Sequence, residues 1–554
     1  MNNETVTKNV SKELSDDSKM VSGAAWMTAG SMISRILGAL YIIPWFQWMG
    51  GQGPGDAANA LYQMGYTPYA FFLALATAGV PSAISKKVSQ YNALGEYEIS
   101  KGIYKQGLKI MALTGLVSAV LMYVLAPLMA ESSPSASASD AVIVIRSLTP
   151  ALLIIPIQSV TRGFLQGHNT MKPSAISQII EQIARIIFLL SAVYVIRQVM
   201  GGEVVTAVAF STFAAFVGAV FALGYLGYQM KSMTTALNVG EEESAGKISV
   251  SPNQLIIEII KTSIPFIIIS TGIIIFQIVD QNTYGPLMSF FSDMDEEMIQ
   301  ITYGITQANA HKLIMVLTSF GTALSIASVP LISKLVAQKN FAQVRRQFSK
   351  GFQLLLFAMF PAAIGMAVVA EPLYTVFYEH SELGTSITQL YAIMSIFVAA
   401  YAVLGNMLQA ASLTRPAIKA LVAGLIVKLI TQVVFVALTG PYGMLYSGIA
   451  GFAVTCAMMM KIMHKEIQFN GTLLFRRSLL IVILSFIMGV VTYLVKWGLG
   501  FFISYESASQ SLFGMAIIVG VGIVVYGYLA LRTKLADRLI GAQATKVRQK
   551  LRIK

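Results

Sequence analysis

Ionisable side chains occur inside the long apolar stretches of this chain, where each needs a partner or a function. The basic members are Arg35, Arg146, Arg185, Lys261, Lys312 and Lys428, and the acidic members are Glu181, Glu258 and Asp280. Placing such a group at the centre of a bilayer costs about 2.5–3.5 kcal/mol on insertion scales. A buried cation stabilises an anion such as a phosphate through charge-assisted hydrogen bonds. The excess of basic groups therefore favours an anionic ligand over a cationic one.

Arg35 and Lys312 are the candidate ligands for such an anion. Arg35 lies near the middle of the apolar stretch 21–48, and no acidic residue lies within a helical turn or two of it. Its side chain is too deep to reach an interface, so we expect it to face a polar cavity or an anion. Lys312 and His311 lie in the stretch 306–333. We expect Lys312 to bind substrate, and His311 to be either a core residue or a substrate-site residue whose protonation gates transport.

The other intramembrane charges are interpreted as gating or structural groups. Glu181 and Arg185 are spaced i, i+4 and are expected to form a salt bridge on one helix. An internal repeat maps Arg185 onto Lys428, which has no acidic residue on its own helix. We expect Lys428 to take a partner from elsewhere, and a lipid phosphate is one candidate.

Two further pairs are expected from position. Lys261 and Glu258 lie one turn apart and are interpreted as a structural pair, and Asp280 is expected to pair with Lys312. The one cysteine, Cys456, lies in an apolar stretch, and no Walker-type phosphate loop, metal-ligand cluster or nucleophile motif is found. The sequence therefore predicts no catalytic residue, no metal site and no cofactor.

Composition places the chain among membrane proteins. It is 55% hydrophobic and 12% charged, whereas a soluble domain is about a quarter charged. The first apolar stretch is too long for a signal peptide and lacks a cleavage site, so we expect a retained helix. Fourteen stretches are long enough to cross a bilayer core of about 30 Å. They are 21–48, 66–85, 104–130, 141–162, 174–196, 204–230, 254–284, 306–333, 351–378, 386–411, 418–438, 442–463, 477–503 and 511–531.

The distribution of Lys and Arg predicts the orientation of these spans. With the N-terminus in the cytoplasm, 31 of the 39 Lys and Arg residues lie in cytoplasmic segments and 2 lie in outer loops. We therefore predict an all-α, multi-pass protein of the cell membrane with both termini cytoplasmic. The basic tail 532–554 is expected to be solvated or lipid-facing rather than to bind nucleic acid.

The two halves of the chain resemble each other in sequence. Matching pairs are 80–86 with 329–334, 100–102 with 349–351, 165–166 with 408–409, and 172–173 with 415–416. An even number of helices per repeat makes the two repeats parallel. Substrate sites in transporters built from repeats lie near the midplane at the repeat interface.

Four segments carry a family resemblance. They read SRILG at 34–38, AGVPSAIS at 78–85, RGFLQG at 162–167 and AISQIIEQIAR at 175–185. Together they resemble the polysaccharide-transporter branch of the MOP exporter superfamily, and within it the Gram-positive SpoVB/YtgP group, which includes MurJ-type lipid II flippases. The resemblance implies two six-helix lobes arranged in a V, alternating access, and a groove for a polyprenyl tail along two extra helices.

The repeat and the resemblance together divide the chain into six predicted parts. These are a disordered cytoplasmic tail (1–20), an N-lobe (21–230), a cytoplasmic linker (231–253), a C-lobe (254–463), two extra helices with the lipid-tail groove (464–531) and a basic cytoplasmic tail (532–554).

The resemblance also implies a role for two residues. Arg35 matches the arginine of the first-span motif, and Lys312 falls near the basic position of the eighth span, so both are expected to hold a diphosphate headgroup. The Arg-Arg pair of some relatives is absent from 62–66, and the spans 418–438 and 442–463 contain no Asp or Glu. A sodium site is therefore not visible, and the membrane potential and a gradient of H+ or Na+ both stay open as driving forces.

We expect a transporter, not an enzyme, that flips lipid II or a similar polyprenyl-diphosphate glycolipid from the inner to the outer leaflet. Membrane lipids are expected contacts and cell-wall synthesis proteins are candidate partners. The alternatives are a flippase for another undecaprenyl-linked glycan of capsule, teichoic acid or sporulation, a multidrug cation antiporter, and a non-transporting cell-wall scaffold. The excess of basic intramembrane groups disfavours the cation antiporter.

Overall fold

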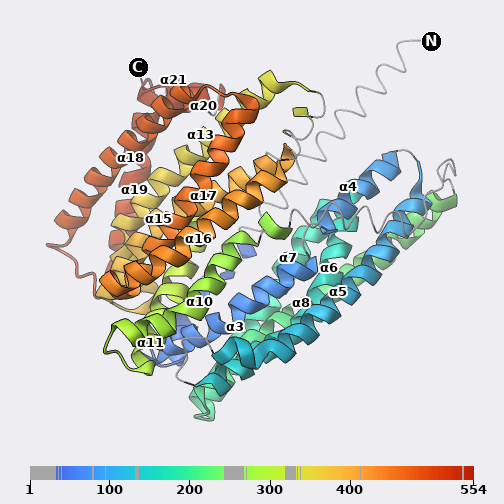
Figure 1. Ribbon diagram of the computed structural model, residues 1–554, viewed down its shortest axis with the longest axis horizontal. Coiled ribbons are helices and arrows are strands. Elements are labelled where there is room, and N and C mark those ends of the chain that lie inside the picture. Colours follow the sequence, from blue (N-terminus) through green and yellow to red (C-terminus); the bar gives the residue numbers. More distant parts are fainter. Residues whose placement is uncertain are drawn as a thin grey trace. The chain divides into compact units, whose positions relative to one another are not determined.

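In the computed structural model, every regular element among the described residues is a helix (Figure 1). The described residues are 33, 34, 37, 38, 40–77, 80–93, 95–131, 137–168, 170–242, 267–269, 271–318, 332, 335, 336, 339–411, 413–539 and 542–553. They separate into two compact units, which are described in turn.

Unit 1 comprises Met1–Trp48, Met64–Glu131 and Ser137–Ile274. Its helices are α2 (Ile42–Trp48), the second part of α3 (Pro54–Thr77), α4 (Val80–Ala93), α5 (Tyr97–Glu131), α6 (Ala138–Gly167), α7 (Met171–Val193), η1 (Tyr194–Val199) and α8 (Val204–Glu242). Helix α6 packs against α4, α5 and α8, and α7 packs against α8. A Cβ atom on Gly218 of α8 would lie 2.6 Å from the carbonyl oxygen of Glu181 of α7, so this crossing needs a glycine.

Unit 2 comprises Met49–Gln63, Ser132–Ala136 and Ile275–Lys554, and so includes the first turns of α3. Its other elements are α10 (Gly272–Phe291), α11 (Glu296–Tyr303), η2 (Gly304–Ala310), α13 (Phe341–Val368), α14 (Ala370–Tyr378), α15 (Glu382–Ala410), α16 (Thr414–Thr439), η3 (Gly440–Tyr442), α17 (Gly443–Ile467), α18 (Gly471–Leu499), α19 (Ala508–Arg532), α20 (Leu535–Leu539) and α21 (Ala542–Lys550). The main packed pairs are α16 with α17, α13 with α18 and α15, and α18 with α19.

Nine segments of the described part are long and apolar enough to cross a membrane. One of them, Thr414–Ile467, has 54 residues and contains both α16 and α17, so the nine cover ten of the predicted spans. About half of each of the predicted spans 21–48, 254–284 and 306–333 lies outside the described residues. An all-α membrane fold is confirmed, whereas the count of fourteen and the side of the termini stay predictions.

The predicted span 66–85 has different bounds in the structure. Helix α3 begins at Pro54, twelve residues before the predicted start, and α4 is a separate helix that begins at Val80. The predicted span 66–85 omits the first turns of α3, which contain polar residues. In the structure Asp56 and Asn59 are buried there, because other polar side chains satisfy them.

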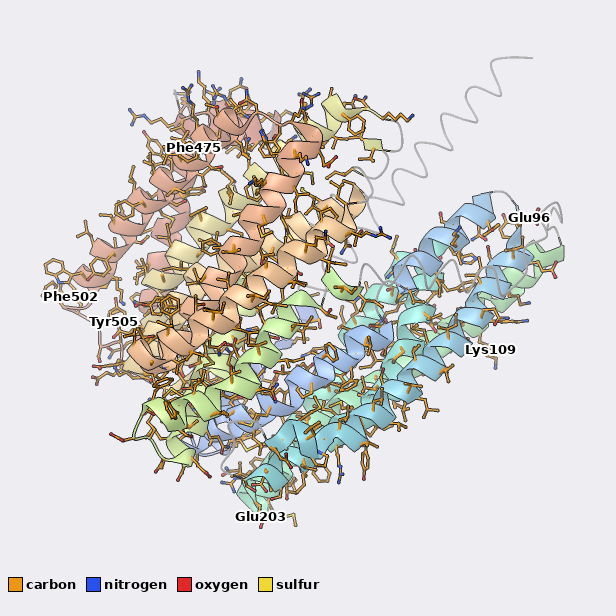
Figure 2. The ribbon with its side chains drawn as sticks, viewed as in Figure 1. Glu96, Lys109, Glu203, Phe475, Phe502 and Tyr505 are labelled. Carbon is orange, nitrogen blue, oxygen red and sulfur yellow. The ribbon has the colours of Figure 1, made fainter. Side chains whose placement is uncertain are left out.

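Helix α18 of unit 2 exposes large apolar side chains along its length. Phe475 lies near its first turn and Phe502 lies just beyond its last turn (Figure 2), and they are 67% and 87% exposed. Phe486, between them, is 65% exposed. Such a continuous apolar surface is expected of a helix that contacts lipid rather than water.

Candidate functional site

A connected set of buried polar side chains joins the first turns of α3 to η2 within unit 2. Asp56, Asn59 and Gln63 recur at helical spacing and therefore share one face of α3, and each is less than 9% exposed. Facing them is η2, a π-helical segment in which all seven residues are buried. Segments of π-helix are rare and occur frequently at functional sites.

Asn309 is the centre of this network. Its Nδ2 donates to Asp56 Oδ1 at 2.6 Å and lies 2.9 Å from the hydroxyl of Tyr374 in α14. Its Oδ1 accepts a hydrogen bond of 2.8 Å from Asn59 Nδ2. The second carboxylate oxygen of Asp56 accepts from the backbone N–H of Gly53 at 3.0 Å. These bonds join α3, η2 and α14 into one polar cluster.

The two helices approach each other closely at this cluster. A Cβ atom on Gly304 of η2 would lie 2.1 Å from the carbonyl oxygen of Asp56, a distance that no side chain allows. Gln300 Nε2 of α11 donates to the carbonyl oxygen of Ala57 at 3.1 Å, beside the same contact. Glycine at 304 is therefore required for the backbone of η2 to reach α3.

Lys312 is part of the same network. It lies in the helical residues 311–318 that follow η2, and its Nζ donates to Asn59 Oδ1 at 2.6 Å. The ammonium also lies 4.6 Å from the centre of the Tyr62 ring, within the range of a cation–π contact. Its described partners thus include a neutral amide and an aromatic ring, which an incoming anion can displace from the ammonium.

His311 uses both ring nitrogens. Nδ1 lies 2.6 Å from the hydroxyl of Tyr391 in α15, and Nε2 lies 3.2 Å from Nε2 of Gln277 in α10. These bonds orient the ring between two helices of unit 2. The arrangement fits a structural role, and the predicted role of His311 in substrate binding or gating stays a prediction.

The expected pair between Asp280 and Lys312 is wrong. Asp280 Oδ1 of α10 accepts from Lys428 Nζ of α16 at 2.6 Å, and both side chains are buried. Gln432 Nε2 and Gln307 Nε2 also donate to the Asp280 carboxylate, at 3.1 and 3.2 Å. Lys428 therefore takes its partner from another helix of the protein and not from a lipid phosphate. Position along the chain could not reveal this pair, because its members are 148 residues apart.

The expected salt bridge between Glu181 and Arg185 in unit 1 is also wrong. Glu181 Oε2 accepts from Arg162 of α6 at 2.9 Å and from Gln158 Nε2 at 2.6 Å. Arg185 instead donates to the hydroxyl of Tyr66 at 3.2 Å, with its guanidinium 5.4 Å from the centre of that ring. The i, i+4 spacing permits the predicted pair, but the α6–α7 contact offers Glu181 a different cation.

Two predicted residues cannot be placed. Arg35 and Lys261, with the partner Glu258 expected for Lys261, lie outside the described residues. Among the residues that the structure describes, no group of three or more His, Cys, Asp or Glu side chains could hold a metal ion. Asp56, Asn59 and Asn309 were not predicted as site residues. The signal for the first two was the recurrence of polar residues at i, i+3 and i+7 from Asp56 to Gln63, which does not include Asn309.

Comparison with known proteins gives consistent matches over most of the chain. A family model described as polysaccharide biosynthesis protein matches residues 20–336, and a MatE model matches residues 308–434. The lipid II flippase MurJ of Bacillus subtilis (strain 168) is 32% identical over 535 residues, which are 95% of this chain and 97% of the relative. Stage V sporulation protein B of the same organism is 26% identical, covering 80% of this chain and 82% of the relative.

Solved structures match the fold. A lipid II flippase MurJ in an inward closed conformation has a TM-score of 0.64 at 18% identity, over 92% of this chain and 98% of that one. The eukaryotic MATE transporter AtDTX14 has a TM-score of 0.58 at 13% identity, over 84% of this chain and 98% of that one. At these identities the structural likeness shows the fold alone.

Proposed function

This chain belongs to the polysaccharide biosynthesis protein family, in the branch of the lipid II flippase MurJ of Bacillus subtilis, and on that premise we propose that it flips lipid II. The cargo moves from the inner to the outer leaflet of the cell membrane by alternating access. The observation that carries the proposal is the 32% identity that extends over 95% of this chain and 97% of the relative. The protein is a transporter and forms no covalent bond with its cargo.

Lys312 and Arg35 hold the diphosphate of the headgroup in this proposal. A diphosphate that leaves water needs compensating positive charge, and a charge-assisted hydrogen bond is about twice as strong as a neutral one. The ammonium of Lys312 rests on Asn59 and Tyr62 in the structure. Exchange of the neutral Asn59 oxygen for a charged phosphate oxygen strengthens the hydrogen bond of the ammonium, which favours binding. Arg35 is included in the proposed diphosphate site because of its position in the SRILG segment.

The Lys312 network links the headgroup ligand to the first turns of α3. Lys312 bonds Asn59, Asn59 bonds Asn309, and Asn309 bonds Asp56. A phosphate that draws Lys312 away from Asn59 therefore removes one support of the contact between α3 and η2. This gives a physical route by which cargo binding favours separation of these two helices.

A second candidate is the flipping of another lipid-linked glycan. The 26% identity to stage V sporulation protein B over 80% of this chain favours it. Both functions use the same diphosphate chemistry and differ in the sugar. A multidrug cation antiporter is disfavoured. The buried carboxylate of Asp280 is already paired with Lys428, so a cationic drug could bind it only by breaking that ion pair.

Depletion of the protein in its native cell tests the proposal. Lipid II on the outer face is measured by its accessibility to an externally added enzyme that cleaves the headgroup. We expect accessible lipid II to fall while total lipid II rises. Unchanged accessibility of lipid II with a loss of another outer-face glycan lipid would select the second candidate. Unchanged accessibility of all such lipids would contradict both.

A further inference from the structure

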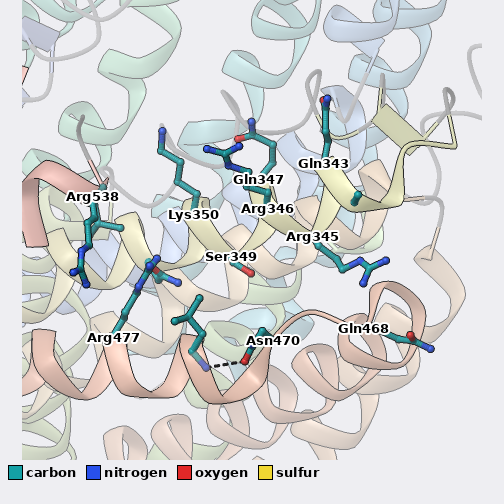
Figure 3. A pocket seen from close by; sticks show the side chains of 14 residues that line it. Gln343, Arg345, Arg346, Gln347, Ser349, Lys350, Gln468, Asn470, Arg477 and Arg538 are labelled. Atoms are coloured by element: carbon teal, nitrogen blue, oxygen red, sulfur yellow. Dashed lines mark hydrogen bonds between the residues drawn. The ribbon is translucent and has the colours of Figure 1, made fainter. Parts of the chain in front are cut away.

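A basic cavity of about 990 Å³ lies in unit 2, away from the Lys312 network. Figure 3 shows that its lining comes from the first turns of α13 and α18 and from α20. Five of the fourteen lining residues are cations: Arg345, Arg346, Lys350, Arg477 and Arg538. No acidic residue is among the described residues that line it. We call this set the basic pocket.

The charges of the basic pocket are not neutralised by the described part of the chain. None of its five cations forms a salt bridge with a described residue. Asp537, the neighbour of Arg538 in sequence, accepts from Arg548 Nε at 2.7 Å instead. Arg477 donates to the amide oxygen of Gln353 at 3.2 Å, while its buried Nε has no hydrogen-bond partner in the described structure. An anion in the pocket would meet donors that nothing described here occupies.

Two helix N-termini add to this positive potential. α13 begins after Asn340 and α18 begins after Asn470, and both asparagines are next to or within the pocket lining. Each asparagine side chain accepts one backbone N–H, from Gln343 and from Leu473, and the second bond is drawn in Figure 3. The other N–H groups of the first turns lack intrahelical acceptors, and helix N-termini favour anions for this reason.

Apolar side chains adjoin the basic pocket, some in a buried cluster and others exposed. Leu539 lines the pocket and belongs to a buried cluster with Leu356 and Ile481, which joins α13, α18 and α20. Leu473, which also lines the pocket, is 43% exposed, and Phe475, two residues further along α18, is 67% exposed. A ligand with an anionic head and an apolar body therefore has contacts for both parts. A soluble anion would use only the contacts with the cations.

We propose that the basic pocket binds the phosphate-bearing headgroup of an anionic phospholipid, with the acyl chains along the exposed apolar face of α18. The distribution of Lys and Arg predicts that this end of the helices is cytoplasmic, which makes the inner leaflet the source of the lipid. Basic pockets between transmembrane helices on this side bind anionic headgroups, and arginine forks suit phosphate oxygens. The site is separate from the proposed flippase site and does not rest on the proposed function.

Lipid binding to the purified full-length protein tests the proposal. Native mass spectrometry measures the apparent affinity for phosphatidylglycerol and for phosphatidylcholine of the same chain length. Each cation near a bilayer surface contributes about a fivefold change in binding, and exposure reduces this. We expect the variant R345Q/R346Q/K350Q to bind phosphatidylglycerol at least tenfold more weakly, roughly the loss expected for three partly exposed cations. R538Q, on a different helix, should weaken the same binding, and phosphatidylcholine binding should not change.

The matched control is K105Q/K109Q/K231Q, which removes three exposed cations from unit 1. Lys109 is labelled on α5 in Figure 2. We expect less than a twofold change in phosphatidylglycerol binding for this control. An equal loss in both triple variants would overturn the proposal, because the net charge and not the pocket would then determine binding.

Two further competition experiments distinguish a phospholipid headgroup from other phosphate-bearing ligands. Inorganic pyrophosphate should compete with phosphatidylglycerol much less well than a second phosphatidylglycerol of different mass does. Equal competition would identify a soluble-anion site and overturn the lipid proposal. Undecaprenyl diphosphate is the third probe. If it displaces phosphatidylglycerol from the wild type at far lower concentration, the pocket is an entry site for cargo and the phospholipid proposal is wrong.

Discussion

Lys428 Nζ and Asp280 Oδ1 lie 2.6 Å apart, with side chains that are 0% and 5% exposed. The pair joins α16 to α10, and Gln432 also donates to the same carboxylate oxygen. In a buried site each charge depends on the other, because an unpaired ion would retain the full cost of its desolvation. This pair is therefore a structural constraint on unit 2 and leaves Asp280 unavailable as a simple cation ligand.

Removal of one member of this pair should destabilise the protein more than removal of both. We expect Lys428→Met or Asp280→Asn to cost about 3–5 kcal/mol each, the range for a buried pair that loses one partner. The double variant should recover part of the loss. Thermal unfolding of the detergent-purified protein checks this, with the exposed Lys465→Met as the control. A loss in the double variant equal to the sum of the two single losses would show that the two charges act independently.

Glu181 provides a direct test of which arginine is its partner. A double-mutant cycle between Glu181→Ala and Arg162→Ala should give a coupling energy of about 1 kcal/mol or more, because the two charges are in contact. The cycle between Glu181→Ala and Arg185→Ala should be close to additive. The readout is the unfolding free energy or midpoint of each variant. A larger coupling to Arg185 than to Arg162 would contradict the structure.

The sequence predicted the class of the fold and the family correctly for physical reasons. Long apolar stretches of about 20 residues have few alternatives to a membrane helix, so their pattern alone is informative. The four resembling segments then identified the superfamily, which the 32% identical relative confirms. The first turns of α3 were missed because polar residues such as Asp56 and Asn59 predict a loop unless their partners are known.

Ion-pair partners could not be predicted in the same way. Asp280 was assigned to Lys312 from their order in the chain, and Glu181 to Arg185 from helical spacing, but each carboxylate bonds a cation on another helix. Helix rotation and packing decide such contacts, and the repeat pattern does not specify them. The basic pocket was missed for a related reason. Its cations were counted only as an orientation signal, although α13, α18 and α20 bring them to one cavity.

Asp56 should make the contact between α3 and η2 sensitive to pH. It lies in the first turn of α3, ahead of the predicted span 66–85, and burial raises the pKa of its carboxyl to about 6, with a smaller contribution from Glu379. Hydrogen bonds from Gly53 and Asn309 oppose this rise. Because the pKa is raised, the proton is bound more tightly here than on an exposed carboxyl. The observed arrangement therefore gains stability as the pH falls through about 6, until the exposed form also protonates near pH 4.

Thermal midpoints measured between pH 7.5 and pH 5 check the effect of Asp56. The wild type should gain stability on acidification relative to Asp56→Asn, by about 1.4 kcal/mol for the one pH unit between pH 6 and pH 5. Glu379→Gln should move the transition to lower pH, since it removes the charge that raises the pKa. If Asp56→Asn shows the same pH profile as the wild type, Asp56 does not titrate in this range.

Cysteine labelling should establish the orientation of the helices. Cys456 is the one cysteine of the chain and is buried. Its replacement by serine therefore gives a background without a thiol. Single cysteines at exposed positions within 49–60 or 285–303, such as Gln52 and Asp293, should react with a membrane-impermeant maleimide from outside the cell. Cysteines in 86–101 or 335–350 should react only after lysis. The reverse pattern would place the termini outside and would also move the basic pocket to the outer leaflet.

Replacement of Arg35 and Lys312 tests the cargo site most directly. Arg35→Ala and Lys312→Ala should each abolish flipping while the protein still inserts and folds, because each removes positive charge that a diphosphate needs in a low-dielectric cavity. Arg35→Lys should retain part of the activity, since an ammonium replaces a planar bidentate fork. The exposed Lys419→Ala is the matched control and should leave flipping unchanged. Outer-face lipid II, measured at matched protein levels, is the readout. Normal lipid II exposure in Arg35→Ala would show that Arg35 is not part of the cargo site. Normal exposure in both alanine variants would contradict the proposed binding of the diphosphate by these two charges and would leave only the family relationship in support of the function.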